Sequence, residues 1–394
     1  MDPRRNPYAP GAGAPPPELA GRDALIERAA IALDRIRSGR HDKSMILVGL
    51  RGVGKTVLLN RVQLDAEERG IHGVRLEAPE DRSLPALMAP AMRAALLRLD
   101  RARAASAAGK KAMRALAGFV GAMKIKFGDV EMGLEVEPEL GLADSGDLDV
   151  DLTDLLIAVG EAARDRSTAF ALFIDELQYI EEDQLASLIS ALHRCAQQQL
   201  PITLFGAGLP QIVGQTGRAK SYAERLFDFP EVGALEEAAA RLALIAPAAK
   251  EGVAFEDPAL VEILRQTRGY PYFLQEWGKH AWSVAASSPI TADDVREATI
   301  HAMADLDASF FRVRFDRLTP TEKHYLRAMA ALGPGPHRSG DIAEKLGRKV
   351  NSLGPTRSAL IGKGMVYSPD HGDTAFTVPL FDQFMKRVMP KSDL

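Results

Sequence analysis

The sequence predicts an α/β fold with a three-layer core around a parallel sheet, followed by an all-helical region and a C-terminal region of short helices and a hairpin. Apolar runs at residues 45–48, 169–174 and 202–205 are bounded by polar or glycine-rich segments, which is typical of strands buried on both faces. Helical patterns separate these runs, so the chain repeats the β-α-β order that builds parallel sheets. From about residue 235 the pattern is almost entirely helical, and strand signals return only near the C-terminus.

The composition limits the class of protein. A chain of 394 residues with 46% hydrophobic residues is long enough for two or three domains. Its net charge of −4 excludes a globally basic nucleic-acid-binding protein, so any such site must be a local patch. The single Cys195 excludes a disulfide framework, and its helical surroundings predict a buried structural thiol. No apolar run approaches the roughly 18 residues of a membrane span, and no signal peptide follows Arg5, so we expect a soluble, cytoplasmic protein.

The N-terminal segment differs from the rest in composition. Residues 1–17 are rich in Pro, Gly and Ala, and such a segment buries too little surface to offset chain entropy. We therefore expect a disordered tail. Ordered structure is predicted from Leu19, with Asp23 capping an amphipathic helix.

A glycine-rich stretch follows the first apolar run and fits the pattern G-x-x-x-x-G-K-[ST], the Walker A loop. Its residues are Gly49, Leu50, Arg51, Gly52, Val53, Gly54, Lys55 and Thr56. Glycines let backbone N–H groups curl around a polyphosphate, and the following helix adds the positive end of its dipole. Lys55 would reach the β- and γ-phosphates, and the Thr56 hydroxyl would ligate Mg²⁺. The alternative, a chance glycine turn, does not explain the strand and helix signals on both flanks, so we predict a P-loop NTPase core that binds ATP.

An insertion is predicted in this core at about residues 83–145. Residues 83–120 form an Ala-rich helical pattern with a basic face, which is either solvated or in contact with phosphate. Residues 123–127 and 130–136 alternate apolar with polar around Gly128 and predict a hairpin. The acidic run 144–151 resembles a calcium loop but lacks its glycine and terminal glutamate at the required spacing. Capping of a helix over residues 152–163 is the preferred explanation.

Two adjacent carboxylates end the apolar run 169–174, in the pattern of a Walker B strand. Open α/β sheets bind ligands at the carboxyl ends of their strands, where Asp175 and Glu176 would lie. Asp175 would hold Mg²⁺ through water, and Glu176 would orient or deprotonate the attacking water. The alternative role, a helix cap after a buried strand, is weakened by the phosphate loop earlier in the chain.

Two further features of the core bear on catalysis. The run 202–205 ends in glycine and alanine, where ATPases with this strand order carry a polar γ-phosphate sensor. Thr203 is the only polar residue nearby, and its alternative role is to fill the strand, so the sensor is left unassigned. Arg225 lies where an arginine finger could reach the γ-phosphate of a neighbouring subunit. Its alternative is an exposed helix arginine paired with Glu224 or Asp228.

Beyond the core, predicted to span residues 18–232, we expect a helical lid at 233–315. Residues 269–271 separate two apolar-periodic helices, and Thr291 caps the next one. Tyr270, Trp277 and Trp282 are more typical of core packing than of stacking against a base.

Residues 316–394 show the order helix, helix, helix, hairpin, which is that of a winged helix. A local basic patch accompanies it, and we expect these residues to contact DNA: Arg338, Arg348, Lys349, Arg357 and Lys363. A winged helix that binds protein instead is the alternative.

With these pieces placed, nearly the whole chain resembles the AAA+ ATPases of the origin-recognition-initiator-like group, which overlap the signal-transducing STAND ATPases. The matching segments are residues 19–23, 49–56, 172–176 with Gln178, 206–210, 269–271 and the C-terminal region. The resemblance implies a base pocket near Gly21 and Arg22, a lid that reads nucleotide state near Tyr270 and Pro271, and ATP-controlled assembly on DNA or with partner proteins. The chain departs from this group in two ways: the strand end at 206–208 lacks a polar sensor, and Gly-Tyr-Pro stands where many AAA+ proteins have a lid arginine. These departures favour the STAND-like type, with slow, switch-like hydrolysis.

Two functions remain open at this point. In the first, an ATP-hydrolysing AAA+ protein gates DNA contact through its winged helix. In the second, the winged helix of a STAND-like switch binds a partner protein, or the chain self-associates. A metabolic kinase is disfavoured because no substrate-phosphate site accompanies the loop.

Overall fold

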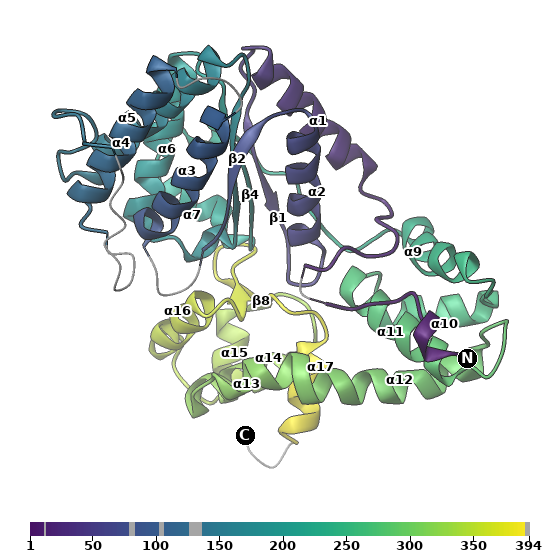
Figure 1. The fold of residues 1–394 in the computed structure, drawn as a ribbon. Coiled ribbons are helices and arrows are strands. Elements are labelled where there is room, and N and C mark those ends of the chain that lie inside the picture. The colour runs from purple at the N-terminus through teal and green to yellow at the C-terminus, as the bar shows by residue number, and fades with distance from the viewer. Residues whose placement is uncertain (12, 79–82, 102–105, 126–135, 391–394) are drawn as a thin grey trace. The chain divides into compact units, whose positions relative to one another are not determined.

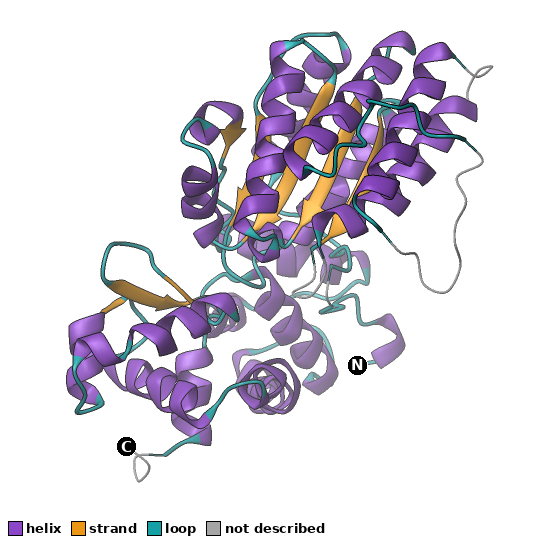
Figure 2. Cartoon of the chain, turned by 90° about the vertical axis from the view of Figure 1, so that its left-hand side faces the viewer, coloured by secondary structure: helices purple, strands orange, loops and turns teal. Residues whose placement is uncertain are grey.

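The computed structural model describes residues 1–11, 13–78, 83–101, 106–125 and 136–390. The chain divides into two compact units. We call Ala24–Val48 with Leu58–Glu231 the sheet unit, and Met1–Asp23, Gly49–Val57 and Val232–Leu394 the helical unit. Each unit has its own hydrophobic core. Figure 1 shows the elements along the chain, and Figure 2 shows their secondary structure.

A five-stranded parallel sheet forms the centre of the sheet unit, in the order β2-β3-β4-β1-β5. The strands are β1 (Ser44–Val48), β2 (His72–Glu77), β3 (Phe170–Asp175), β4 (Ile202–Gly208) and β5 (Phe227–Asp228). Every residue of β3 and β4 is buried, as their continuous apolar runs predict. The predicted α/β fold class is therefore confirmed.

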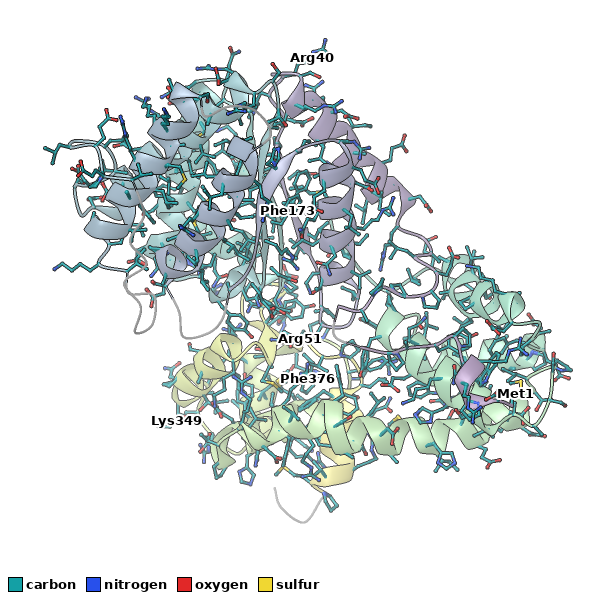
Figure 3. All side chains as sticks on the ribbon, viewed as in Figure 1. Met1, Arg40, Arg51, Phe173, Lys349 and Phe376 are labelled. Atoms are coloured by element: carbon teal, nitrogen blue, oxygen red, sulfur yellow. The ribbon has the colours of Figure 1, made fainter. Side chains whose placement is uncertain are left out.

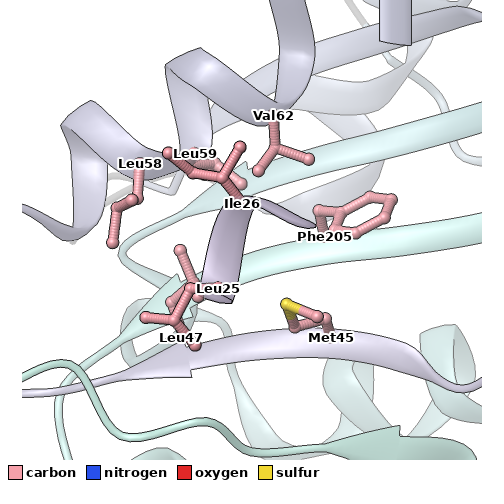
Figure 4. A pocket seen from close by; sticks show the side chains of 8 residues that line it. All are labelled: Leu25, Ile26, Met45, Leu47, Leu58, Leu59, Val62 and Phe205. Carbon is pink, nitrogen blue, oxygen red and sulfur yellow. The ribbon is translucent and has the colours of Figure 1, made fainter. Parts of the chain in front are cut away.

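Helices cover both faces of this sheet, so the core has three layers. Figure 1 shows α1 and α2 on one side and α3 to α6 on the other. The bounds are α1 (Asp23–Arg37), α2 (Lys55–Glu68), α3 (Leu84–Arg101), α4 (Ala107–Ala122), α5 (Leu148–Asp165), α6 (Glu182–Gln197), α7 (Gln211–Ala219) and α8 (Ala223–Leu226). A cavity of about 10 Å³, lined only by apolar side chains of α1, α2, β1 and β4, remains between the layers (Figure 4). That volume is close to a single water, and without polar partners the cavity is a packing defect rather than a binding site.

The described part of the predicted insertion contains α3 and α4, whereas its last residues, 136–145, form turns and irregular structure. Most of the predicted hairpin, residues 126–135, lies outside the described residues. The acidic run caps a helix, although α5 starts at Leu148 rather than at residue 152. Asp147 is its N-cap, and the fully buried Asp151 accepts hydrogen bonds from Ser145 N (2.9 Å) and Gly146 N (2.8 Å).

The helical unit contains two groups of elements. The first is α9 (Glu237–Lys250), α10 (Asp257–Thr267), α11 (Pro271–Val284), α12 (Ala292–Leu306), a π-helical turn η3 (Asp307–Phe311) and α13 (Arg312–Asp316). The second is α14 (Pro320–Leu332), β6 (His337–Arg338), α15 (Ser339–Lys345), η4 (Val350–Ser352), α16 (Gly354–Gly362), β7 (Val366–Tyr367), β8 (Asp373–Phe376) and α17 (Phe381–Val388). Strands β6, β8 and β7 form an antiparallel sheet in that order. Thr291 forms the predicted cap, and Trp277 and Trp282 lie in the core, as expected.

The N-terminal segment corrects a prediction, because it is ordered where a disordered tail was expected. Tyr8 is 3% exposed and its hydroxyl donates to the Leu244 carbonyl at 2.5 Å. A Cβ at residue 278 would come within 2.7 Å of the Tyr8 ring, so Gly278 leaves the space that the ring fills. The Tyr8 ring acts together with further contacts, such as the hydrogen bonds from Arg5 to Glu251 and from Asn6 to the Lys279 carbonyl, and composition alone does not reveal such contacts.

Candidate functional site

The Walker A residues join β1 to α2, as predicted. Gly52 and Gly54 have φ of 80° and 90°, which favours glycine. A Cβ at Gly49 would lie 2.1 Å from the Val232 carbonyl oxygen, so no side chain fits there. Lys55 begins α2, and its ammonium donates to the carbonyls of Gly49 (2.9 Å) and Leu50 (2.8 Å). These bonds fold the lysine back over its own loop, at the start of the helix where phosphate binds in such loops.

Two backbone hydrogen bonds with distant parts of the helical unit hold the loop. The Tyr272 N–H donates to the Gly52 carbonyl at 3.1 Å. The Arg51 N–H donates to the Thr377 carbonyl, just after β8, at 3.0 Å; Figure 3 labels Arg51. The loop is therefore in contact with both α11 and the C-terminal elements. Sequence reasoning missed Tyr272 and Thr377, although Tyr272 directly follows the Gly-Tyr-Pro segment that it singled out.

The two residues predicted near the base, Gly21 and Arg22, lie beside the loop. The Arg22 guanidinium donates to the carbonyls of Val53 (3.2 Å) and Gly233 (2.5 Å), and burial lowers the pKa of Arg22. Gly21 has a φ of 67°, and a Cβ there would meet the Ala239 side chain at 2.6 Å. Arg22 thus supports the loop backbone, and a base pocket beside it stays a prediction.

The predicted lid residues lie at the start of α11. Tyr270 is its N-cap residue and Pro271 its first residue, a position that suits proline. Gly269 has a φ of 72°, and a Cβ there would lie 2.4 Å from the Leu235 carbonyl oxygen. Tyr270 is half-buried, and burial raises the pKa of its hydroxyl. Contact of these residues with a nucleotide stays a prediction.

Asp175 is the last residue of β3 and is 3% exposed. Its Oδ1 accepts the Glu176 N–H at 2.9 Å, and its Oδ2 accepts the Arg75 guanidinium at 3.1 Å. Arg75, on the neighbouring β2, also donates to Asn60 Oδ1 at 3.2 Å. Sequence reasoning missed Arg75. The sequence shows only that a cation lies within a strand, and in the structure this cation is partly buried. Because β1, β3 and β4 are parallel, the carboxylate lies at the edge of the sheet where β1 ends and the loop begins.

Glu176 follows in a left-handed conformation, with φ 53° and ψ 39°. Such a conformation costs free energy in a residue with a side chain and is common at functional sites. The Gln178 side-chain amide donates to the Glu176 carboxylate, and the Leu209 N–H donates to Gln178 Oε1 at 3.0 Å. Gln178 therefore connects the end of β3 to the end of β4.

Thr203 is wrong as a candidate sensor. It pairs with Ala171 in the sheet, four residues before Asp175 along the neighbouring strand. At about 3.3 Å per residue, that offset is about 13 Å. The hydroxyl is buried inside the sheet unit, far along the strands from the carboxylates.

Arg225 is exposed on the short helix α8. Asp228, one of the expected partners, instead pairs with Arg28 at 2.5 Å. Action of Arg225 in a neighbouring subunit stays a prediction.

The five cations predicted to contact DNA do not form one free surface. Arg338, Arg348 and Lys349 are exposed, and Figure 3 labels Lys349. Arg357 instead donates to Thr374 Oγ1 (2.8 Å) and to the Asp373 carbonyl (2.8 Å), and Lys363 pairs with Glu322 at 2.7 Å. These last two hold α16 to β8 and α14, which corrects the prediction for them.

Comparison with known proteins bears on the fold. Residues 18–205 match the family model of the AAA ATPase domain. This part of the chain is similar to AAA ATPase domains. A second model, described only as a domain of unknown function, matches residues 308–385. No curated protein is significantly similar to the chain.

A solved structure supports the fold. The Walker-type ATPase PABY2304 of Pyrococcus abyssi is 16% identical, with a TM-score of 0.59 over 93% of this chain and 96% of that one. RuvB of Thermotoga maritima (16% identity, TM-score 0.46, 95% and 97% covered) and Orc1 of Aeropyrum pernix, solved with DNA (15%, 0.47, 94% and 93%), are more distant. At these identities the likeness to the Pyrococcus protein concerns the fold alone. None of the described helices has both the length and the apolar character that a membrane crossing needs.

Proposed function

We propose that this protein binds ATP with Mg²⁺ and hydrolyses it slowly, as a switch that signals through its helical and C-terminal regions. The observation that carries the proposal is the pairing of two motifs on one sheet. A glycine-rich loop with Lys55 at the start of a helix follows β1, and two carboxylates end β3 at the same edge. Phosphate binding and water activation are the chemistry that these two groups supply in ATPases.

The oxygen donors fit Mg²⁺. The Thr56 hydroxyl would bind the ion directly and the Asp175 carboxylate through water, and both are the hard oxygen ligands that Mg²⁺ prefers. Among the described residues no group of three or more His, Cys, Asp or Glu side chains could form a metal cage by itself. ATP phosphates and waters would therefore supply the remaining ligands, as is usual for this ion. When bound, Mg²⁺ would neutralise charge on the phosphates.

Within this proposal each protein group has a defined task. Lys55 and the loop amides hold the β- and γ-phosphates, and Glu176 takes a proton from the attacking water. Arg75 keeps the charge of the buried Asp175 compensated.

A switch, rather than a simple hydrolase, is supported by the contacts of the loop. Tyr272, which donates to the loop, stacks on Phe310 of η3 with ring centroids 4.8 Å apart. Phe311 in the same turn stacks on Phe384 of α17 at 5.3 Å. Because π-helical turns are frequent at functional sites, this aromatic series is suited to carrying a change at the loop to the C-terminal elements.

The test is turnover by the full chain and by two variants. Glu176→Gln should bind ATP with near-normal affinity and lose about 100-fold or more in kcat, because a general base contributes that much. Lys55→Ala should lose ATP binding itself, whereas Lys110→Ala, on an exposed face of α4, should bind normally. Turnover that survives Glu176→Gln would contradict the assigned base, and tight ATP binding by Lys55→Ala would contradict the assigned loop.

The C-terminal elements then have two candidate targets. The order α14, β6, α15, α16, β7, β8 supports a winged helix, and the exposed Arg338, Arg348 and Lys349 support DNA contact. The internal roles of Arg357 and Lys363 favour a partner protein instead, since α16 then exposes mainly small, uncharged residues.

Salt dependence separates the two targets. If DNA binds, its affinity should fall steeply with salt, and Arg348→Ala should reduce the slope of log K against log salt by about 1. Lys110→Ala again serves as the control. Binding to a duplex that is weak and unaffected by Arg348→Ala would leave the partner protein as the target.

A further inference from the structure

The end of β4 explains why the expected polar sensor is missing. A Cβ at Gly206 would lie 2.3 Å from Leu177 Cδ1, and a Cβ at Gly208 would lie 3.2 Å from Gln178 Oε1. Both glycines therefore make room for side chains of the turn that follows Glu176. The strand end is apolar because a residue of the β3 turn occupies the space next to it.

Gln178 brings a polar group to this position from the other strand. It is 6% exposed, and both ends of its amide are used: the NH₂ group donates to Glu176, and Oε1 accepts the Leu209 N–H at 3.0 Å. Its own carbonyl accepts the Gln215 side chain at 3.3 Å. These bonds fix the amide on two sides, so the direction of its NH₂ group is determined.

We propose that Gln178 is a positioning residue for Glu176 and supplies from the β3 turn the polar group that the end of β4 lacks. The inference rests on the proposed hydrolysis. Glu176 has a left-handed backbone, and a hydrogen bond to its carboxylate restricts where that group lies relative to the attacking water. Gln178 acts through Glu176 and does not contact the reacting atoms.

A purely structural role makes a different prediction, and Gln178→Glu separates the two. This change keeps the shape and the acceptor for the Leu209 N–H, but it replaces the donor to Glu176 by a carboxylate that also repels Glu176. Gly208→Ala is therefore measured beside it, because its Cβ would lie 3.2 Å from Gln178 Oε1 and it adds no charge. If Gln178 only ties the turn to β4, the uncharged variant Gly208→Ala should hydrolyse ATP at nearly the normal rate. If Gln178 positions Glu176, kcat should fall about tenfold or more while KM and the affinity for a non-hydrolysable ATP analogue change less than about threefold.

A double-variant cycle sharpens the test. Because Gln178 acts through Glu176, the Gln178→Glu change should alter the residual single-turnover rate by less than about threefold in a Glu176→Gln background. An undiminished tenfold loss in that background would overturn the inference, since it would show an effect independent of Glu176.

Gln184 provides a matched control. It makes the same pair of bonds, donating to Glu181 (2.9 Å) and accepting the Leu84 N–H (2.6 Å), away from the two carboxylates. Gln184→Glu should leave kcat unchanged. If Gln178→Glu does not fold, Gly208→Ala provides a second test, because its Cβ crowds Gln178 Oε1 without changing the amide; it should also lower kcat with little change in ATP affinity.

The outcomes distinguish this inference from the function on which it rests. Suppose that the wild-type chain turns over ATP, Glu176→Gln is inactive and Gln178→Glu is fully active. That result overturns the role of Gln178 and leaves the proposed hydrolysis intact. A wild-type chain without ATP turnover overturns the proposed function and the inference with it.

Discussion

The phosphate loop and the carboxylate pair are held in different ways. The loop is held by backbone groups of residues more than 200 positions later, the Tyr272 N–H and the Thr377 carbonyl. The carboxylates are held by two side chains from the same unit, Arg75 for Asp175 and Gln178 for Glu176. The loop therefore depends on how α11 and the C-terminal elements fold, whereas the carboxylates depend on individual side chains near them.

This difference has a physical consequence for mutations. Backbone hydrogen bonds do not depend on the side chain of the residue that makes them. ATP binding should therefore tolerate many substitutions at Tyr272 and Thr377, but not a side chain that collides with the loop backbone. A buried carboxylate that loses its cation is left uncompensated, so the sheet edge should be sensitive to single polar changes. Four predictions test the contrast.

The largest effect is expected from a steric change in the loop. Gly49→Ala places a Cβ 2.1 Å from the Val232 carbonyl oxygen, so the backbone must move, and ATP affinity should fall about 100-fold or more by titration with a fluorescent ATP analogue. Gly121→Ala, with open space around it on α4, should bind normally. Normal affinity in Gly49→Ala would show that the loop is not held as rigidly as its contacts indicate.

The next effect concerns the carboxylates. Arg75→Met leaves Asp175 buried with one acceptor unpaired, and the free energy of unfolding should fall by about 2 to 3 kcal/mol in urea. Arg218→Met removes an exposed pair with Glu182 and should cost about 1 kcal/mol or less. Equal losses of unfolding free energy in the two variants would show that the ion pair of Asp175 contributes no more than an exposed surface pair.

A smaller effect is expected at the side chain beside the loop. Tyr272→Leu keeps the backbone N–H that donates to Gly52 but removes the stack on Phe310. Stability should fall by about 1 kcal/mol, since aromatic pairs contribute that order, and ATP affinity should change less than in Gly49→Ala. An affinity loss as large as that of Gly49→Ala would mean that the side chain, rather than the backbone, supports the loop.

The smallest effect depends on pH. Burial raises the pKa of Glu276, which accepts a hydrogen bond from the Tyr272 hydroxyl at 3.1 Å. The folded state therefore binds this proton more tightly than the unfolded state, and the stability it contributes is lost as pH rises from the ordinary glutamate range through the raised pKa. Glu276→Gln should flatten that part of the profile in thermal unfolding measured between pH 4 and 8. An unchanged slope would exclude Glu276 as its source.

The sequence predicts the parts of this protein whose signals are local. Residues 49–56, Asp175 and Glu176 are recognisable because a few residue types at fixed spacing carry their chemistry, and β3 and β4 because their apolar runs are uninterrupted. Arg75 was missed, and Gln178 was noted as a matching residue without a role, because their partners are set by strand order and by the turn after β3, not by spacing. The prediction of a disordered tail over residues 1–17 failed because composition does not show that Tyr8 is buried. The prediction of DNA contact by Arg357 failed because a basic run does not show which cations bond to the protein itself.

The single cysteine has a practical use. Cys195 is 1% exposed, and burial raises the pKa of its thiol to about 12, so little thiolate is available to maleimides at neutral pH. The natural chain can therefore serve as an unreactive background for labelling. One cysteine introduced on the surface of each unit would carry a fluorophore pair, and energy transfer between the dyes would report any change in their separation when ATP is added.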